Sequence, residues 1–152
     1  MVVRPAELED HEEWLSMRSA LWPDCPAAEH LAEMRAYAGA GDRQMAFVAE
    51  LGSICGFVEA SLRPSAEGCT TAPVGYLEGI YVLPDKRHRG VGRALVNAAE
   101  AWAVSRGCTE MASDCLLENL ASERFHRNLG YSVTERLVHF RRALSKSATP
   151  TH

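Results

Sequence analysis

The order of apolar and polar positions divides this chain into segments with helical spacing and segments with strand character. Apolar residues recur three or four positions apart in several stretches, which is typical of amphipathic helices. The predicted helices cover residues 9–22, 27–38, 90–106 and 120–128. Runs rich in β-branched and aromatic residues, separated by turn residues, predict strands. These strands cover residues 2–4, 44–50, 54–62, 73–83, 109–114 and 131–142.

This order of elements predicts an α/β (α+β) fold. One strand precedes two helices, three strands follow as a meander, and helices and strands then alternate as helix, strand, helix, strand. A mixed, mostly antiparallel central sheet flanked by helices accommodates that order, whereas a doubly wound nucleotide fold alternates strictly. We expect a single domain over residues 1–144 and a disordered tail over residues 145–152.

Composition and charge narrow the class of protein. The chain has 152 residues, of which 47% are hydrophobic and 24% charged, as in an ordinary globular domain. Its net charge of −4 gives no reason to expect nucleic acid as a partner. A mildly acidic protein instead attracts cations.

The cysteines and the lengths of the apolar runs indicate in which cellular compartment the protein is found. Five widely spaced cysteines with no C-x-x-C pair argue against a disulfide framework or a zinc site, so we expect no metal. No signal peptide and no apolar run of about 18 residues is visible, which predicts a cytoplasmic protein without a membrane partner.

The segment 82–95 (VLPDKRHRGVGRAL) joins a predicted strand to a helix through a basic turn with two glycines. A helix start has unpaired N–H groups and partial positive charge, and glycine lets an anion approach the backbone closely. A Walker loop would need Lys and a hydroxyl after Gly92, and a dinucleotide fingerprint would need glycine at Leu95. The turn therefore predicts a phosphate or pyrophosphate site of another kind. The alternative is a glycine-capped turn without a ligand.

Two motifs together resemble the GNAT superfamily of N-acetyltransferases. They are Arg87-x-x-Gly90-x-Gly92 after a strand ending V-L-P, and N-x-A-x-x-x-F-H-x-x-x-G-Y over residues 119–131. The resemblance implies a GNAT-like fold that binds acetyl-CoA. It implies that the turn holds the pyrophosphate and that neighbouring groups meet the pantetheine. The cofactor residues so implied are Ile80, Tyr81, Val82, Arg87, His88, Arg89, Gly90, Val91, Gly92, Asn119 and His126.

Further segments are similar to aminoglycoside 6′-N-acetyltransferases, namely L-W-P at 21–23, L-E-G-I at 77–80, E-M-A-S-D at 110–114, E-N at 118–119 and T-E-R at 134–136. The likeness implies a homodimer built by the last strands or the amino-terminal helices. It also implies acetylation of a primary amine of a small polycationic acceptor, the 6′-amine of an aminoglycoside antibiotic, which would confer resistance. The rival hypotheses are acetylation of a polyamine or a protein amino terminus, or an acyl-CoA-binding module without catalysis.

Three carboxylates are candidates for the acceptor site. Strand alternation places Glu78 on one face with Ile80 and Val82, where a carboxylate is costly unless it is paired or faces a cleft. Glu78 and Asp114 are the predicted catalytic bases and substrate ligands, since the resemblance gives the family such residues at these positions. The alternatives are a structural Glu and an Asp that starts a turn. Glu135 is a third substrate candidate, with a surface carboxylate as its alternative.

Four other side chains are candidates for the site, and three of them have two interpretations each. Trp22 forms an aromatic wall of the substrate site or belongs to the core. Cys25 stands where related enzymes can carry a histidine that contacts substrate. His126 stands where many GNAT members have a tyrosine that protonates the departing thiolate, or it is a partly buried helix residue. Asn119 bonds the pantetheine or caps the helix that begins after it. The sequence places no convincing base beside any cysteine, so we expect direct transfer without an acetylated enzyme.

Overall fold

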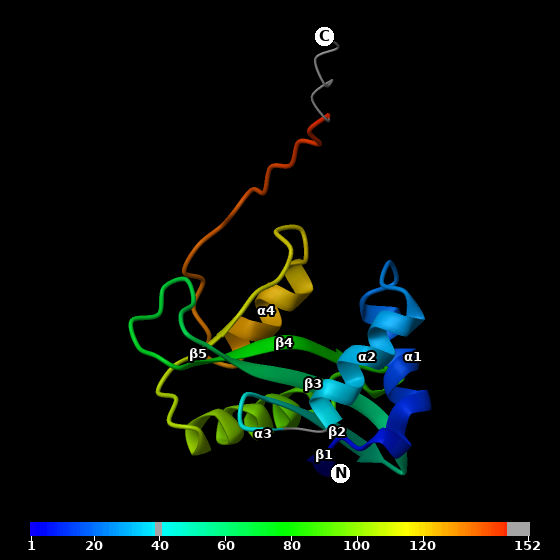
Figure 1. Cartoon of the computed structure of the whole chain (residues 1–152). Coiled ribbons are helices and arrows are strands. Elements are labelled where there is room, and N and C mark those ends of the chain that lie inside the picture. Colours follow the sequence, from blue (N-terminus) through cyan, green and yellow to red (C-terminus); the bar gives the residue numbers. More distant parts are fainter. Residues whose placement is uncertain (39–40, 146–152) are drawn as a thin grey trace.

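The computed structural model describes residues 1–38 and 41–145 and has a central five-stranded sheet in the order β1-β2-β3-β4-β5 (Figure 1). The first four strands are antiparallel neighbours, and β5 runs parallel to β4. The predicted mixed, mostly antiparallel sheet is thus confirmed. The strands are β1 (Val2–Pro5), β2 (Gln44–Leu51), β3 (Ser53–Arg63), β4 (Val74–Val82) and β5 (Met111–Ser113). The helices are α1 (His11–Leu21), α2 (Ala27–Ala38), α3 (Val91–Ser105) and α4 (Leu120–Asn128).

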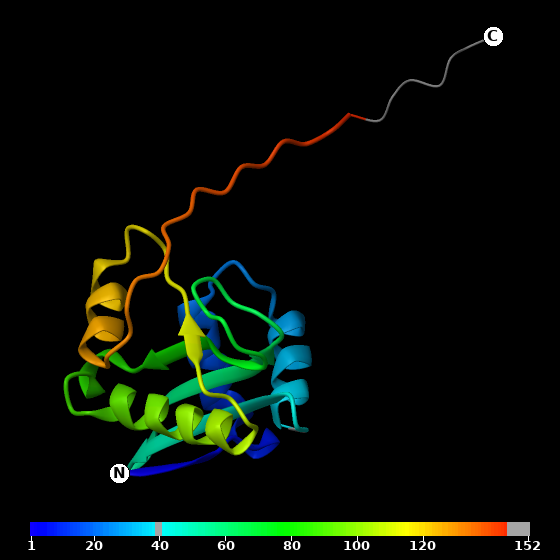
Figure 2. The same ribbon diagram turned by 90° about the vertical axis from the view of Figure 1, so that its left-hand side faces the viewer.

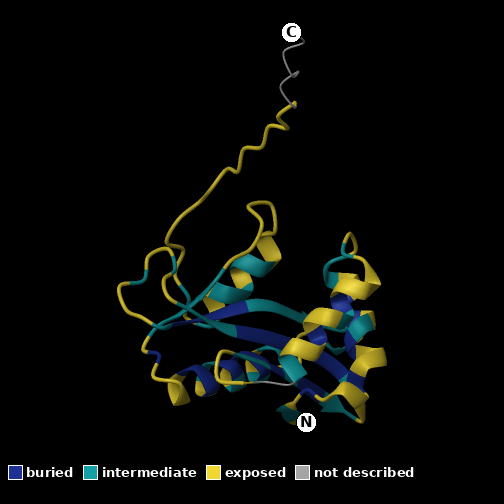
Figure 3. Cartoon of the chain, viewed as in Figure 1, coloured by how far each residue is buried: buried dark blue, intermediate teal, exposed yellow. Residues whose placement is uncertain are grey.

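Helices cover both faces of the sheet and make two apolar cores. Helix α3 packs under β2, β3 and β4, whereas α1 and α2 cover the opposite face (Figures 1 and 2). Alternate residues of β3 enter the two cores: Val58 and Ala60 pack with α3, and Phe57 packs with α1 and α2. Burial on both faces explains why the sequence of β3 is a nearly continuous apolar run. Figure 3 shows this buried layer between the helices.

The predicted last strand at 131–142 is wrong. Residues 132–145 are exposed and have no regular secondary structure, and the chain runs away from the body of the molecule (Figures 2 and 3). Phe140 is 92% exposed and Val138 is 69% exposed. An alternating sequence forms a strand only where another backbone completes its hydrogen bonds, and β5 offers an edge of three residues. The expected disordered tail lies almost wholly outside the described residues.

Candidate functional site

The site lies where β4 and β5 separate. The two strands pair only between Gly75–Leu77 and Met111–Ser113. Beyond Leu77, β4 keeps its pairing with β3 on one edge. Within the described residues, its other edge has no strand partner from 78 to 82. An unpaired strand edge presents backbone donors and acceptors to any extended ligand that can align with it.

The basic turn follows β4 directly. A 3₁₀ turn at Pro84–Lys86 leads to Gly90, which precedes α3 with a φ of 81°, a conformation that suits glycine. Arg87 donates to the carbonyl of Val82 at 2.8 Å. A Cβ on Gly92 would lie 2.9 Å from the ring of Phe125, so this position has room for glycine alone. The first turn of α3 has no acidic side chain, which leaves its N–H groups and partial positive charge to an anion.

Glu78 owes its direction to a β-bulge. Gly79 pairs with Glu59 and Leu77 pairs with Ala60, so Glu78 is an extra residue without a partner on β3. A bulge breaks strand alternation and re-aims a side chain. The predicted face of Glu78 is therefore wrong, because Ile80 and Val82 pack against the core on the α3 side.

Arg63 and Ser61 of β3 bind the Glu78 carboxylate. The Nε and Nη2 atoms of Arg63 donate to its two oxygens at 2.9 and 2.7 Å, and the Ser61 hydroxyl donates at 2.5 Å. The guanidinium of Arg63 also lies 3.5 Å from the centre of the Tyr76 ring. The Tyr76 hydroxyl in turn donates to Asp114 at 2.5 Å. The two predicted carboxylates are thus linked through Arg63 and Tyr76.

Glu78 also lines a cavity of about 330 Å³ between the sheet and the first two helices. The cavity is bounded by Arg18, Trp22, Glu33, Ala36, Tyr37, Gln44, Glu59 and Glu78. Three of these eight side chains are carboxylates. A cavity of this size and charge suits part of a cationic small molecule.

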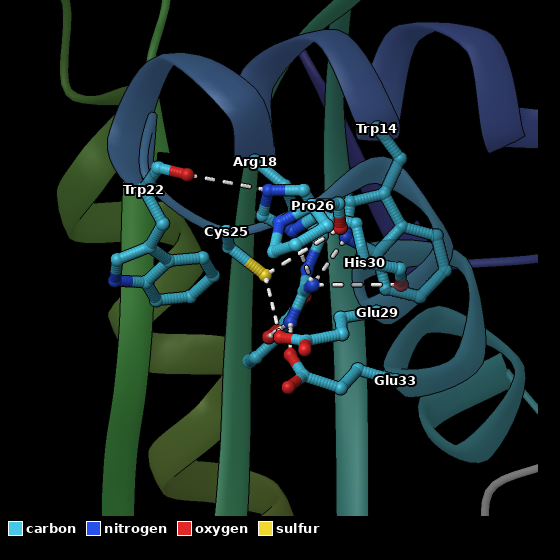
Figure 4. Close-up of polar contacts among 9 residues, drawn as sticks. Trp14, Arg18, Trp22, Cys25, Pro26, Glu29, His30 and Glu33 are labelled. Atoms are coloured by element: carbon cyan, nitrogen blue, oxygen red, sulfur yellow. Dashed lines mark hydrogen bonds and ion pairs between the residues drawn. The ribbon is translucent and has the colours of Figure 1, made fainter.

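A buried ion pair supports one wall of this cavity (Figure 4). Arg18 donates to both oxygens of Glu59 at 2.7 and 3.0 Å, and each side chain is 1% exposed. The Trp14 indole donates to the same carboxylate at 3.0 Å. Burial alone would lower the pKa of Arg18, but its bonds to Glu59 and Glu33 raise it, so the guanidinium stays charged.

Trp22 is both a core residue and a wall of the cavity. Its ring lies 4.9 Å from the Arg18 guanidinium and stacks beside His30 at 6.4 Å. A Cβ on Gly79 would collide with the indole, which shows how tightly Trp22 covers β4. His30 accepts from Arg18 through Nδ1 at 2.8 Å, so Nε2 bears the proton toward the Trp22 carbonyl at 3.3 Å. The partly buried Cys25 closes the turn after Trp22, since its backbone N–H donates to the Trp22 carbonyl at 3.2 Å.

The comparisons with known proteins agree with this geometry. Residues 11–131 match the family model described as Acetyltransferase (GNAT) family. The chain belongs to this family. Aminoglycoside N(6′)-acetyltransferase type 1 from Klebsiella aerogenes is 46% identical over 147 residues, which cover 94% of this chain and 97% of the relative. The protein of the same name from Salmonella enteritidis is 39% identical over 93% of this chain and 99% of the relative.

Solved structures resemble this GNAT acetyltransferase over nearly its whole length. AAC(6′)-Iy in complex with the bisubstrate analog CoA-S-monomethyl-acetylneamine has a TM-score of 0.87 and 38% identity, over 94% of this chain and 98% of that chain. Apo AAC(6′)-IG from Acinetobacter haemolyticus has a TM-score of 0.87 and 38% identity, over 95% and 100%. The GNAT-like fold expected from the sequence is confirmed.

We call the place where β4 and β5 separate, beyond Leu77 and Ser113, the fork. Helix α4 lies on the β5 side of the fork in this GNAT acetyltransferase, because His126 contacts Ser113. The Asn119 side chain accepts the Ser122 N–H at 3.1 Å, which confirms that it caps α4. The Nδ1 of His126 faces the Ser122 carbonyl at 2.7 Å, so Nδ1 bears the proton in neutral His126. Its Nε2 then accepts from the Ser113 hydroxyl at 2.8 Å. Protonation of a leaving thiolate by His126 stays a prediction.

Glu135 lies apart from the other two predicted carboxylates. Its two sequence neighbours hold the chain near the body of the molecule. The Thr134 hydroxyl donates to the Glu67 carbonyl at 3.3 Å, and the Arg136 guanidinium pairs with Glu123 of α4 at 2.6 Å. Glu135 itself is exposed, and no bond joins it to Glu78 or Asp114 among the described residues. The structure brings Glu78 and Asp114 together and leaves Glu135 at the surface.

Arg63, Arg18 and Glu59 were not among the site residues predicted from the sequence. Glu59 is a carboxylate inside an apolar run, a signal equal to that of Glu78. Arg63 carries no comparable signal, because its role depends on the pairing of β3 with β4.

Across residues 1–38 and 41–145 the structure contains no cluster of three or more potential metal ligands. No helix in the same ranges has the length and apolar character to cross a bilayer.

Proposed function

We propose that this chain transfers the acetyl group of acetyl-CoA directly to the 6′-amine of an aminoglycoside. The observation that carries the proposal is the place of Glu78. It lines the acidic cavity and begins the unpaired edge of β4, so a cation in the cavity and an extended ligand on the edge meet there. The identity to aminoglycoside N(6′)-acetyltransferases over nearly the whole chain supports the choice of acceptor.

We propose that the acetyl donor binds to the basic turn before α3 and to the unpaired edge of β4. The backbone of Val91 and Gly92, with the cations of Arg87, His88 when protonated and Arg89, suits a pyrophosphate at the start of α3. A Cβ at Gly90 would meet no atom within 4 Å, so the backbone there is open on that side, whereas Gly92 lets the first turn of α3 pack directly against Phe125. Acetyl-CoA supplies an activated acetyl thioester when bound.

The pantetheine arm fits the free edge of β4. The backbone groups of Ile80, Tyr81 and Val82 pair with it in our proposal, with Asn119 and His126 on the opposite side of the fork. A backbone N–H from this edge stabilises the negative charge that develops on the thioester oxygen.

The acceptor side uses opposite charge. Glu78 and Asp114 bind the amine and its neighbours, and either carboxylate or a water molecule takes the proton from the attacking nitrogen. Trp22 provides an aromatic surface for a ring or a cation. Cys25 and Glu135 are proposed as outer substrate contacts. Aligning both reactants supplies several kcal/mol of the acceleration.

Direct transfer agrees with the state of four of the five cysteines. Desolvation raises the pKa of the Cys25, Cys55, Cys69 and Cys108 thiols, so each is a poor nucleophile at neutral pH. Incubation with acetyl-CoA alone should leave the protein mass unchanged. A stable acetylated protein would contradict this step.

Thiol release from acetyl-CoA tests the acceptor. The panel contains kanamycin, tobramycin, spermidine and a peptide, and compares wild type with Glu78→Gln and with Glu12→Gln on the exposed side of α1. We expect rapid turnover on the aminoglycosides, a loss of about 100-fold or more in Glu78→Gln, and no loss in the control. Turnover on spermidine or the peptide alone would remove the substrate assignment, and acetyl-CoA binding without any turnover would indicate a binding module.

A homodimer is part of the proposal. The exposed segment 132–145 has apolar side chains at Val138, Phe140 and Leu144 and an alternating pattern that suits pairing with a second copy. Light scattering after size exclusion should give a dimer for the full chain and a monomer for a chain ended after residue 131. A monomeric full chain would refute it.

A cytoplasmic location is also proposed. Five free cysteines suit a reducing compartment. Cell fractionation tests this, and recovery of the protein outside the cytoplasm would contradict it.

A further inference from the structure

The position of Arg63 has a consequence for the acceptor amine. Its guanidinium is the cation nearest to Glu78, bound through both oxygens, and it lies flat on Tyr76 beside Asp114. A positive charge of the protein therefore occupies the space between the two carboxylates that are proposed to meet a cationic acceptor. Hydrogen bonds to Glu78 raise the pKa of Arg63, so it is charged at every pH of interest.

This arrangement is unexpected for a site that only binds cations. Arg63 competes with any ammonium for the Glu78 carboxylate and weakens the attraction of a polycation. The Arg63 side chain is 41% exposed and the Glu78 side chain 24% exposed, so the pair is not required to neutralise a deeply buried charge. Because Arg63 weakens the binding of a cationic acceptor, we expect it to favour a step of the reaction other than binding.

That benefit follows from the chemistry of the acceptor. An amine attacks a thioester only in its neutral form, and nearby negative charge stabilises the ammonium form instead. We propose that Arg63 offsets the negative charge of Glu78 and Asp114, so that the bound acceptor amine gives up its proton at neutral pH. Arg63 is a positioning residue, because it acts on the amine through Glu78. The inference rests on the proposed function.

The other charged groups that face the cavity leave this task to Arg63. Arg18 is already engaged, since it binds Glu59 through two bonds and Glu33 through a third. Burial raises the pKa of Tyr37 and of Tyr76, which keeps both phenols neutral, and the hydrogen bond of Tyr76 to the Asp114 carboxylate adds to its shift. Around the cavity and the adjoining Asp114, two arginines lie near four carboxylates, so the loss of one arginine makes the local net charge substantially more negative. The arginines are Arg18 and Arg63, and the carboxylates are Glu33, Glu59, Glu78 and Asp114.

The test compares wild type with Arg63→Met, which keeps the stem and removes the charge, and with Arg63→Lys, which keeps the charge. Arg106→Met is the matched control, because it removes an arginine–carboxylate pair with Asp42 at the far end of α3 from the basic turn. Turnover of the wild type on kanamycin is measured first, which checks the proposed function independently of the variants. Acetyl-CoA binding and circular dichroism check that each variant folds.

In Arg63→Met we expect a lower KM for kanamycin, a lower kcat near neutral pH, and an acid limb of the kcat profile moved to higher pH by about one unit. The kcat of this variant should return to within about twofold of wild type on the alkaline plateau, since the amine is then neutral without help. Arg63→Lys should show a smaller shift, and Arg106→Met none.

Proton release gives a second measurement that does not depend on turnover. Calorimetry of kanamycin binding in two buffers of different ionisation enthalpy counts the protons released, and we expect fewer for Arg63→Met than for wild type. A raised KM with an unmoved acid limb and unchanged proton release would show that Arg63 only holds Glu78 in place, and would overturn the inference. An inactive wild type would instead refute the proposed function.

Discussion

Arg18→Met tests whether the buried ion pair under the acceptor cavity is held by charge or by packing. Methionine keeps the apolar stem of the side chain and removes the guanidinium. The Glu59 side chain is then left without its cation at 1% exposure, and among the described residues only the Trp14 indole still donates to it. Removing one partner of such a pair costs about 3–5 kcal/mol of the free energy of unfolding, because an uncompensated buried charge remains.

The loss should depend on pH in a defined direction. Burial already raises the pKa of Glu59 above its ordinary value of 4.5, even with Arg18 present. Without Arg18 the folded protein holds the proton more firmly than the unfolded chain. The variant is therefore most stable below the ordinary pKa of a glutamate and loses stability as the pH rises through the raised value. We expect a larger loss near pH 8 than near pH 5.

Urea unfolding followed by circular dichroism at a fixed protein concentration measures both effects. The matched double variant Arg18→Met/Glu59→Gln removes the orphaned charge and keeps an acceptor for Trp14, so it should recover more than half of the loss. A loss of less than about 1 kcal/mol that is equal at both pH values would refute the reasoning. A double variant no more stable than Arg18→Met would refute it as well.

Three further changes follow from single contacts. Gly79→Ala places a methyl group against Trp22, so KM for kanamycin should rise several-fold with acetyl-CoA binding unchanged; an unchanged KM would contradict the placement of the indole. Gly92→Val crowds Phe125 beside the basic turn and should weaken acetyl-CoA binding by about tenfold or more in calorimetry, whereas kanamycin binding stays the same. Asp10→Asn should lower the free energy of unfolding by about 1–3 kcal/mol at neutral pH. Arg4 of β1 donates to both oxygens of Asp10 at 2.8 Å, and these hydrogen bonds lower the pKa of Asp10. The difference should therefore vanish as the pH falls through that lowered value, and a difference that persists in acid would count against the Arg4–Asp10 pair.

Local features of this chain are predictable from the sequence alone. Helix α4 begins and ends at the predicted residues 120 and 128, because its cap at Asn119 and its stop at Gly130 are local signals. The basic turn before α3 is predictable for the same reason, since the proline fixes its own φ and Gly90 permits the positive φ that the turn needs. Glu78 stands out as a carboxylate in an apolar strand, where an unpaired charge is costly, and Asp114 is indicated by the resemblance to the family.

Contacts between distant segments are not predictable in this way. Whether residues 131–142 form a strand depends on a partner backbone, and the alternating pattern is the same with or without one. The direction of Glu78 depends on a bulge created by the pairing of β3 with β4, which strict alternation misses. Likewise Arg63 meets Glu78, and Arg18 meets Glu59, across 15 and 41 residues of chain. Spacing and caps act over a few residues and leave a record in the sequence, whereas these pairs exist only once the sheet and the helices have packed.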